Sequence, residues 1–435
     1  MSVKKRRWLI LSHCYNMDGR AASQTITDKI PFLLEHDVEP IVVSALTGEK
    51  DKLLEHYRVP SLAPSGLKFE ARHLIRSKIH NSILRKLAKS SISALLLVPY
   101  LLEKIFVRLD SHWSWAFSAR NKSMKLLKSK NFELIYSTGG ANCAHHAASM
   151  LKKRMALPWI AEIHDPMYNK DWPRNTKTKW SQKLEKKICK EADLIWWFTD
   201  KAKERAQKRN PSLGEKGHVI IPGCECPKFS TAYKKDEFFN LAHFGSLHET
   251  RNLVSLIRAI SKNKKSDPLF CSKTRLHIYG SHLDSYSRTA AKKHGIEDMI
   301  VEHGRVEKDP MSGKSGRQQV LDAMRCVDLL ILLHGESSDC EEYIPSKLYE
   351  YLWTQRPVLG IIWENKLLTK ILEEQGHAYA ASDNYELIAT QLLNYFNMWN
   401  SPRGLSDSGR NSPFSTKDSV MQIISLYDEN CPNKK

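Results

Sequence analysis

Short apolar runs alternate with longer, amphipathic segments along nearly the whole chain. Runs rich in Val, Ile, Leu and Trp are typical of strands that are buried on both faces of a parallel sheet. The segments between the runs are long enough for helices, so the pattern predicts an α/β fold with parallel sheets. In the first half we expect strands at 8–12, 40–44, 134–137, 159–163, 194–199 and 219–222. In the second half we expect them at 241–245, 276–279, 300–303, 329–333 and 358–362.

The chain is long enough for two domains, because its 435 residues can supply two separate cores. A polar, irregular stretch at 226–238 separates the two sets of predicted strands, and we place the linker there. The predicted domains therefore span 1–230 and 236–412. A second loop, rich in Ser, Gly and Pro, covers 402–416 and precedes a last predicted helix near 417–427.

Each half begins with a strand that runs into a glycine-containing loop and then into a helix. The first loop contains Gly19 and Arg20, and the second begins with Gly245 and Ser246. Neither loop has the spacing G-x-G-x-x-G, so the fingerprint of a dinucleotide-binding site is absent. Ligands of open α/β sheets bind beyond the carboxyl ends of the strands, where both loops are predicted to lie.

The chain is strongly basic, with 67 Lys and Arg against 48 Asp and Glu and a net charge of +19. This excess favours a polyanionic partner, which is a nucleic acid, an anionic membrane or an anionic substrate. The nine cysteines are scattered and form no cluster with the spacing of a zinc site. We therefore expect free thiols in a reducing cytosol. The apolar stretch at 8–11 is too short for a signal peptide and reads as a first core strand.

The segment 68–108 concentrates positive charge, with nine Lys or Arg against two Glu. Apolar side chains recur in it every four residues, at Ile75, Ile79, Ile83 and Leu87. This spacing predicts an apolar stripe on one basic helix. An apolar run at 92–102 follows, broken by Pro99, and it is too short to span a membrane. Two interpretations stay open: helices that lie in an anionic membrane interface, which we favour, and an insertion that packs its stripe on the core.

The stretch 341–360, EEYIPSKLYEYLWTQRPVLG, places Glu342 and Glu350 eight positions apart with Lys347 between them. Pro345 suits the first turn of a helix, and a loop that enters a helix presents free backbone N–H groups that can bind phosphate. The two carboxylates can accept hydrogen bonds from hydroxyl groups on either side. The pattern therefore fits a nucleotide-sugar, although a solvated surface helix has the same composition.

The string at 341–360 resembles the E-x7-E motif of retaining GT-B glycosyltransferases of the family 4-like group, in which Pro-Ser-Lys follows the first Glu. The resemblance covers nearly the whole chain. It implies two Rossmann-like domains that face a cleft, an N-terminal one for the acceptor and a C-terminal one for the nucleotide-sugar. It also implies that the C-terminal helix crosses back, so that about 417–435 completes the first domain. The basic segment, 68–110, would be a membrane-facing insertion of that first domain.

Residues 131–167, NFELIYSTGGANCAHHAASMLKKRMALPWIAEIHDPM, resemble the acceptor-domain core of bacterial members of this group. By that match His145 lies at a helix start, and His164 and Asp165 lie at a strand end. A His at a strand end can bind a sugar hydroxyl or stabilise developing charge, and the alternative is a His that loop backbone satisfies. We place Gly19, Arg20, His145 and Asp165 on the acceptor side.

The segment 245–252, GSLHETRN, resembles the loop that grips the donor phosphates. Many members of the group carry Arg directly after the Gly and Lys seven positions after it. Ser246 and Asn252 occupy those positions here, so the basic role would pass to Arg251. The resemblance assigns donor binding to Gly245, Ser246, Arg251, Ser346, Lys347 and Glu350. It assigns catalysis to His164, Glu342, Arg251 and Lys347.

In the reaction that this resemblance implies, the diphosphate leaves the anomeric carbon and the acceptor attacks from the same face. The protein then supplies positive charge to the leaving group and needs no nucleophile of its own. The sequence contains no D-x-D pair, which is typical of metal-independent GT-B enzymes. We therefore expect no metal and no other cofactor, with the nucleotide-sugar as a substrate.

The sequence thus predicts a cytoplasmic glycosyltransferase, peripheral on the inner face of the cell membrane, that uses a surface-glycan or lipid-linked acceptor. The expected partners are the nucleotide-sugar, this acceptor and an anionic membrane surface, with no nucleic acid. One alternative is a GT-B-fold sugar-nucleotide epimerase, which needs the same donor contacts but no membrane surface. The other is a basic nucleic-acid-binding protein, although no recognised binding motif is present.

Overall fold

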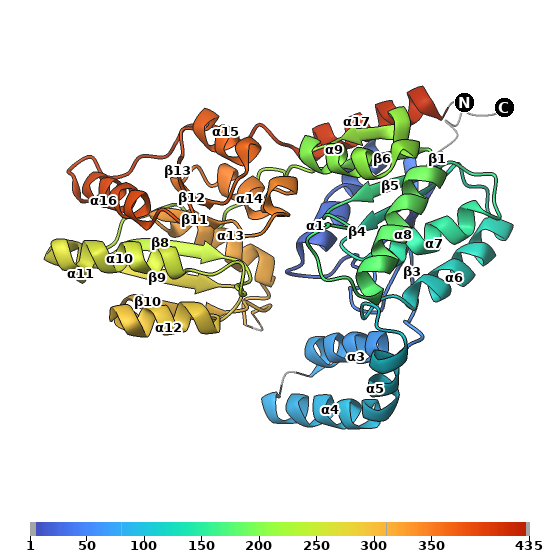
Figure 1. Cartoon of the computed structure of the whole chain (residues 1–435), viewed down its shortest axis with the longest axis horizontal. Helices are drawn as coiled ribbons and strands as arrows, with labels where there is room; N and C mark the ends of the chain where they lie inside the picture. The colour runs from blue at the N-terminus through green and yellow to red at the C-terminus, as the bar shows by residue number, and fades with distance from the viewer. Residues whose placement is uncertain (1–5, 80, 310, 432–435) are drawn as a thin grey trace. The chain divides into compact units, whose positions relative to one another are not determined.

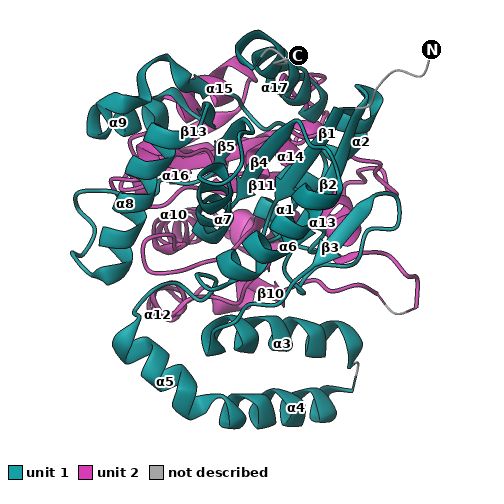
Figure 2. Ribbon diagram, turned by 90° about the vertical axis from the view of Figure 1, so that its right-hand side faces the viewer, with its two compact units in different colours: residues 1–223, 416–435 teal, residues 224–415 magenta. Residues whose placement is uncertain are grey.

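The computed structural model describes residues 6–79, 81–309 and 311–431, and the chain forms two compact units (Figure 2). Unit 1 comprises Met1–Gly223 and Thr416–Lys435, and unit 2 comprises Cys224–Ser415. The division falls just before the stretch 226–238 that we expected as a linker. In the structure this stretch belongs to unit 2, where the Tyr233 hydroxyl donates a hydrogen bond to Asp328.

Unit 1 is built on a parallel sheet of seven strands in the order β3-β2-β1-β4-β5-β6-β7 (Figure 1). Its strands are β1 Arg6–Leu11, β2 Val38–Ser44, β3 Glu55–Arg58, β4 Leu134–Gly139, β5 Trp159–Ile163, β6 Leu194–Trp197 and β7 Gly217–Val219. Its helices outside the basic segment are α1 Ala21–Thr27, α2 Ile30–Glu35, α6 Trp115–Ser129, α7 Asn142–Lys152, α8 Thr176–Glu191, α9 Asp200–Arg209 and α17 Thr416–Asn430.

Two apolar cores cover the two faces of this sheet, because successive side chains of a strand point to opposite faces. In β1, Leu9 and Leu11 belong to a core that α6, α7 and α8 complete. Trp8 and Ile10 belong to the other core, with side chains of α1, α2 and α17. The C-terminal helix α17 therefore completes unit 1, and the ring of its Tyr427 lies 5.2 Å from that of Trp8.

Unit 2 contains a second parallel sheet, of six strands in the order β10-β9-β8-β11-β12-β13. Its strands are β8 Phe239–Phe244, β9 Thr274–Tyr279, β10 Ile300–Gly304, β11 Leu329–Leu333, β12 Val358–Ile362 and β13 Ala378–Ala381. Its helices are α10 Val254–Ser266, α11 Pro268–Lys273, α12 Ser285–His294, α13 Gly316–Cys326, α14 Lys347–Trp353, α15 Lys366–Glu374 and α16 Tyr385–Asn400. Together the two sheets confirm the predicted α/β fold with two Rossmann-like domains.

Each predicted strand overlaps an observed one. Two observed strands, β3 and β13, were not predicted from the sequence. Both missed strands have four residues and lie at an edge of their sheet. Edge strands are short and only half buried, so they lack the continuous apolar run that marks a central parallel strand.

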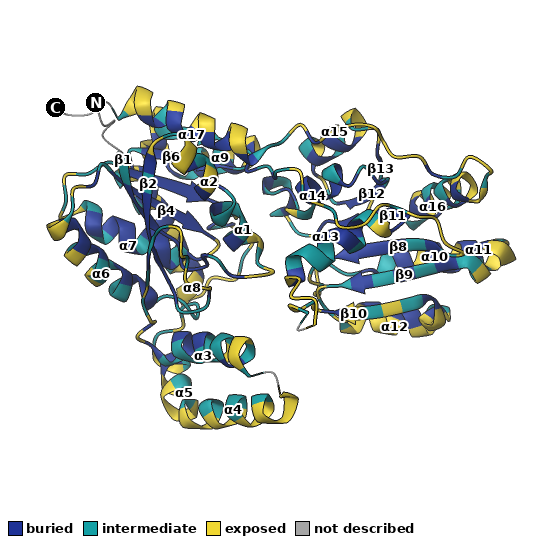
Figure 3. Cartoon of the chain, turned by 180° about the vertical axis from the view of Figure 1, so that it is seen from behind, coloured by how far each residue is buried: buried dark blue, intermediate teal, exposed yellow. Residues whose placement is uncertain are grey.

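The basic segment folds into three helices, α3 Pro64–Lys78, α4 Ser82–Leu95 and α5 Leu97–Phe106. The prediction of one helix with a single apolar stripe is therefore wrong. The Asn81 side chain accepts hydrogen bonds from the amides of Ile83 and Leu84, so it caps a new helix and breaks the stripe. Ile75 is buried, whereas Ile83 is 67% exposed. Figure 3 shows exposed surface along much of α4 and α5.

Among the described residues, no helix is both long enough and apolar enough to cross a membrane.

Candidate functional site

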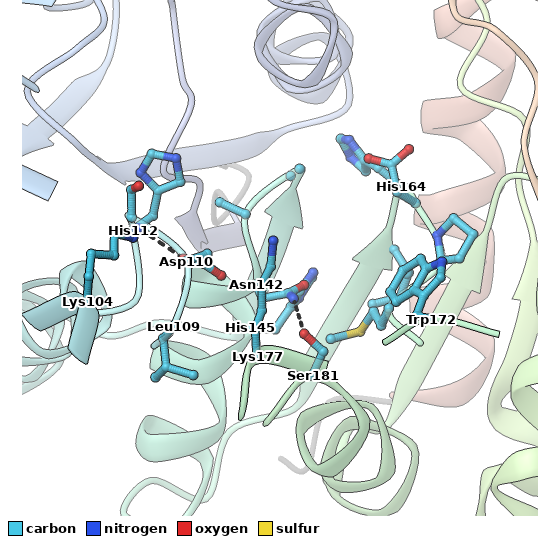
Figure 4. A pocket seen from close by; sticks show the side chains of 18 residues that line it. Lys104, Leu109, Asp110, His112, Asn142, His145, His164, Trp172, Lys177 and Ser181 are labelled. Carbon is cyan, nitrogen blue, oxygen red and sulfur yellow. Dashed lines mark hydrogen bonds between the residues drawn. The ribbon is translucent and has the colours of Figure 1, made fainter. Parts of the chain in front are cut away.

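A pocket of about 570 Å³ opens in unit 1 at the carboxyl ends of β4 and β5 (Figure 4). The loops that follow these strands form part of its wall, together with the starts of α7 and α8. The remaining wall comes from Lys104 of α5 and from the stretch 109–112 that follows this helix. The pocket thus lies where open parallel sheets bind ligands.

Three of the predicted acceptor-side and catalytic residues, His145, His164 and Asp165, line this pocket. Gly19 and Arg20 do not. The guanidinium carbon of Arg20 lies 5.4 Å from the centre of the Phe69 ring, so this side chain contacts α3 of the insertion.

Several polar and aromatic side chains of the pocket were not singled out from the sequence: Lys104, Asp110, His112, Asn142, Trp172, Lys177 and Ser181. Figure 4 shows Asp110 and His112 on the side of the pocket opposite His164 and Trp172. Carboxylates, an amide and a hydroxyl around an aromatic ring fit a carbohydrate, whose hydroxyls need polar partners. No local motif marks these residues, because they come from segments that are distant in the sequence.

A buried carboxylate next to the pocket fixes the position of His164. Glu162 lies two positions after Ile160 on β5 and therefore on the same face of the sheet, toward the core that contains Trp8, and it has no exposed surface. Five side chains donate to its two oxygens: Lys29, Tyr136, Thr138, His164 and Trp196. The distance from His164 Nε2 to Glu162 Oε1 is 2.7 Å. The His164 ring is therefore held by a fixed charge at the end of the strand.

The charge on Glu162 depends on this surrounding set of donors. Burial alone would raise the pKa of its carboxyl, but the Lys29 ammonium and His164 hold that pKa well below its usual range. Glu162 is therefore ionised, and the Nε2 of His164 donates to it. The Nδ1 of His164 has no hydrogen-bond partner among the described residues, so it is available to a polar group in the pocket.

His145, the second histidine of the pocket, is held by hydrogen bonds to side chains of the core. Its side chain is buried, and burial with repulsion from His164 lowers its pKa to about 3, so the ring is neutral. Trp159 Nε1 donates to Ser137 Oγ at 2.8 Å, and the Ser137 hydroxyl in turn lies 2.9 Å from His145 Nδ1. This chain of bonds fixes the position of the His145 ring. The pocket therefore contains two histidines that are each held by buried hydrogen bonds.

In unit 2 the two segments assigned to donor binding lie side by side. The amide of Glu336 donates to the carbonyl of Thr250 at 2.6 Å, which joins the loop after β11 to the loop after β8. Arg251 Nη2 donates to the Tyr343 hydroxyl at 3.0 Å. Arg251 is thus brought next to the start of the E-x7-E motif. Gly245 and Ser246 come directly after β8, in the first of these loops.

The two carboxylates of the motif are both buried. Glu342, at the end of a short 3-10 turn, is 3% exposed, and Glu350, in α14, is 4% exposed. Lys347 forms an ion pair with Glu350 one turn away, and Arg317 Nε lies 3.7 Å from the same carboxylate. Ser346 precedes the helix and is exposed. The structure therefore joins Lys347 to Glu350 and adds Arg317, which was not predicted.

Asn252 stands where many members of the resembling group carry Lys, and its side chain bonds to the backbone of its own loop. Its side-chain amide donates to the carbonyl of Glu249 at 2.7 Å, and its oxygen accepts from the amide of Val254 at 3.1 Å. Asn252 therefore shapes the turn that leads into α10, and the positive charge near the donor residues comes from Arg251, Arg317 and Lys347.

Neither a family model nor a curated protein matches this chain. Solved structures do match it over almost its whole length. A mutant of TarM from S. aureus, in complex with fondaparinux, α-GlcNAc-glycerol and UDP, has a TM-score of 0.63 at 10% identity, covering 98% of this chain and 100% of that one. WaaG, a glycosyltransferase involved in lipopolysaccharide biosynthesis, has a TM-score of 0.53 at 13% identity, covering 98% and 94%. WaaB, a lipopolysaccharide outer core galactosyltransferase, has 0.51 at 12% identity, covering 98% of both chains. At these identities the likeness shows the fold, which is that of the GT-B glycosyltransferases.

Replacing Lys29 by Met tests the buried pair with Glu162. Removal of one partner leaves a buried, uncompensated charge, so we expect a loss of about 3 to 5 kcal/mol in the free energy of unfolding at neutral pH. The wild-type contribution of Glu162 is present above its unfolded pKa and is lost as the pH falls, because its folded pKa is lowered. The deficit of the variant should therefore shrink on acidification.

Urea unfolding followed by circular dichroism measures this deficit, from neutral pH down to about pH 4. Lys183→Met is the control, because Lys183 is exposed on α8 of the same unit. A Lys29→Met variant as stable as this control would show that the ion pair contributes nothing.

Proposed function

We propose that this protein is a glycosyltransferase that moves a hexose from a nucleotide-sugar to a surface-glycan or lipid-linked acceptor, with retention and without a metal. The observation that supports this most is the group around Glu350. A buried carboxylate stands there between Lys347 and Arg317, at one end of a motif whose other end is the buried Glu342. Cations flanked by two carboxylates match the diphosphate and the two hydroxyl-rich ends of a nucleotide-sugar.

Each residue has a defined part in this proposal. Lys347 is 27% exposed in its side chain, so it can leave Glu350 and bind the diphosphate. Glu350 then accepts hydrogen bonds from the ribose hydroxyls, while Glu342 accepts them from hydroxyls of the transferred sugar. When the bond from the anomeric carbon to the diphosphate breaks, its electron pair stays on the diphosphate, which Lys347 and Arg251 stabilise.

The pocket of unit 1 supplies the acceptor contacts. His164 and His145 can form hydrogen bonds with oxygens of the acceptor and so orient it. In front-face attack the proton of the attacking hydroxyl passes to the departing phosphate oxygen, while the acceptor oxygen bonds to the anomeric carbon. Neither histidine therefore has to take up that proton.

Proteins with this fold support the proposed substrate classes. The TarM complex contains UDP and α-GlcNAc-glycerol, and WaaG and WaaB are glycosyltransferases of lipopolysaccharide. A UDP-type donor and a cell-envelope acceptor are therefore the first candidates for this chain.

The exposed side chains of the insertion support a location of the protein on the inner face of the cell membrane. Of the twenty exposed large hydrophobic side chains among the described residues, ten lie on α4 and α5: Ile83, Leu84, Leu87, Leu95, Leu97, Val98, Leu101, Leu102, Ile105 and Phe106. Glu70 of α3 and Glu103 of α5, the two carboxylates of the three helices α3 to α5, are both buried. The exposed charges of the insertion are thus positive, which suits an anionic leaflet next to an apolar surface.

Variants of the donor group test the proposed nucleotide site. Lys347→Ala removes the phosphate cation and Glu350→Gln removes the ribose acceptor, so we expect each to abolish the thermal stabilisation that the correct nucleotide gives the wild type. Lys370→Ala, an exposed position on α15 of the same unit, should retain it. Unchanged nucleotide affinity in both site variants would contradict the assignment of the nucleotide site to Lys347 and Glu350.

Activity should survive chelation, because the sequence has no D-x-D pair and the proposed site offers basic side chains to the diphosphate. The test is turnover of the nucleotide-sugar with and without EDTA. Activity that disappears with the chelator and returns with manganese would contradict this part of the proposal. A product that is an isomer of the donor, formed without any acceptor, would instead identify the epimerase.

Apolar contact with the membrane can be tested at two exposed positions of α5. The wild type should co-sediment with anionic vesicles, bind neutral ones weakly and be partly released by salt. Val98→Asp with Phe106→Asp should reduce binding by roughly a hundredfold or more, since each buried side chain of this kind contributes about 1.5 to 3 kcal/mol. Leu387→Asp with Met421→Asp, at exposed positions outside the insertion, is the control and should bind as the wild type does.

A further inference from the structure

The insertion contains a cavity of its own, separate from both groups described above. It has a volume of about 320 Å³ and lies between α3 and α4, lined by Arg72, Lys89, Ser90 and Ser93. Figures 1 and 2 both show α3 and α4 side by side, with α5 joining them at one end. None of the four lining residues belongs to the pocket of unit 1.

The polar side chains that line this cavity do not bond to other parts of the protein that the structure describes. Among the described residues, the side chains of Arg72, Lys89, Ser90 and Ser93 make no hydrogen bond and no ion pair. The two carboxylates that could neutralise them point elsewhere. Glu70 accepts from the amide and the hydroxyl of Ser61, and Glu103 is bound by Ser65 and Trp113. The cavity is open to water at the exposed Arg72 and Ser90, and it offers two positive charges and two hydroxyls that make no bond to the protein among the described residues.

This set of donors fits a phosphate group. An Arg guanidinium presents two parallel N–H groups to phosphate oxygens, and Lys adds a point charge. The two serine hydroxyls can donate to the remaining oxygens of a tetrahedral anion. A phosphomonoester carries about −1.5 to −2 charges at neutral pH, which matches two cations better than the single charge of a phosphodiester.

The surroundings of the cavity show how such a phosphate would arrive. On α4, the same helix that carries Lys89, the side chains of Ile83, Leu84 and Leu87 are all more than half exposed. A phosphate bound beside these side chains would lie at the level of the head groups while they enter the bilayer. A soluble phosphate would gain nothing from this apolar neighbourhood.

We propose that the cavity binds the phosphomonoester head group of a membrane lipid, and this inference rests on the proposed membrane contact of the insertion. Such a site orients the insertion on the bilayer by a defined contact at one point. General attraction to a charged leaflet would depend only on the number of basic residues.

Two kinds of vesicle separate a defined phosphate site from general attraction. We would use phosphatidylcholine vesicles that carry either phosphatidic acid, a phosphomonoester, or phosphatidylglycerol, a phosphodiester, adjusted to equal surface charge. The full-length wild type should bind the phosphatidic acid vesicles about tenfold more tightly, as two additional charge-assisted contacts allow.

Matched variants assign this preference to the cavity. Arg72→Gln with Lys89→Gln should remove the preference, and Ser90→Ala with Ser93→Ala should reduce it without any change of charge. The control is Arg76→Gln with Lys86→Gln, which also removes one Arg from α3 and one Lys from α4, at positions that do not line the cavity. The control should weaken binding to both kinds of vesicle equally and keep the preference.

The outcomes distinguish this inference from the proposed function. Equal binding to both vesicles, or a preference that survives in Arg72→Gln with Lys89→Gln, overturns the phosphate site while the membrane contact stands. Displacement of the wild type from phosphatidic acid vesicles by millimolar inorganic phosphate, to the level of the cavity variant, assigns the site to free phosphate and overturns the lipid. A wild type that binds neither vesicle overturns the membrane contact together with this inference, whereas nucleotide stabilisation in every variant would leave the donor site intact.

Discussion

A carboxylate without exposed surface at the end of a central strand can exist as a charge only when the surrounding elements supply donors. Around Glu162 these donors come from β4, β6, the residue before α2 and the loop after β5. The carboxylate thus ties together elements that are distant in the sequence, at the point where the pocket opens. The geometry of His164 is a consequence of this constraint, because its ring nitrogen is one of the required donors. Any ligand hydroxyl in the pocket therefore meets a histidine whose ring position is already set.

The two ion pairs at the candidate sites differ in what they can do. Lys29 and Glu162 are 1% and 0% exposed in their side chains, so neither can leave its partner without a buried charge remaining. Lys347 is 27% exposed, and its pair with Glu350 can open toward water or toward a ligand at little cost. The first pair therefore fixes the position of His164, and the second can open, as the proposed binding of a diphosphate and a ribose requires.

The sequence was informative about features that lie within one continuous segment. The alternation of apolar runs predicted the central strands of both sheets, and the E-x7-E spacing drew attention to Glu342, Lys347 and Glu350, whose role in donor binding stays a prediction. It was not informative about contacts made over long distances. Arg317 reaches Glu350 from another helix, and Trp172 joins His164 only through the folded loop after β5. The break between α3 and α4 was missed for a local reason, because one Asn cap outweighed an apolar period that continued across it.

The insertion shows how burial changes the meaning of a charge count. By sequence the segment 68–108 has a net charge of +7, nine basic residues minus two acidic ones. In the structure Glu70 and Glu103 point inward and hold Ser61 and Ser65, so the negative charges do not reach the outer surface. The field that a membrane would meet is therefore stronger than the count indicates. The same helix α5 that exposes Val98 and Phe106 also contributes Lys104 to the wall of the pocket in unit 1. A lipid-linked acceptor held at the bilayer surface would thus have its polar end next to the pocket that is proposed to receive it.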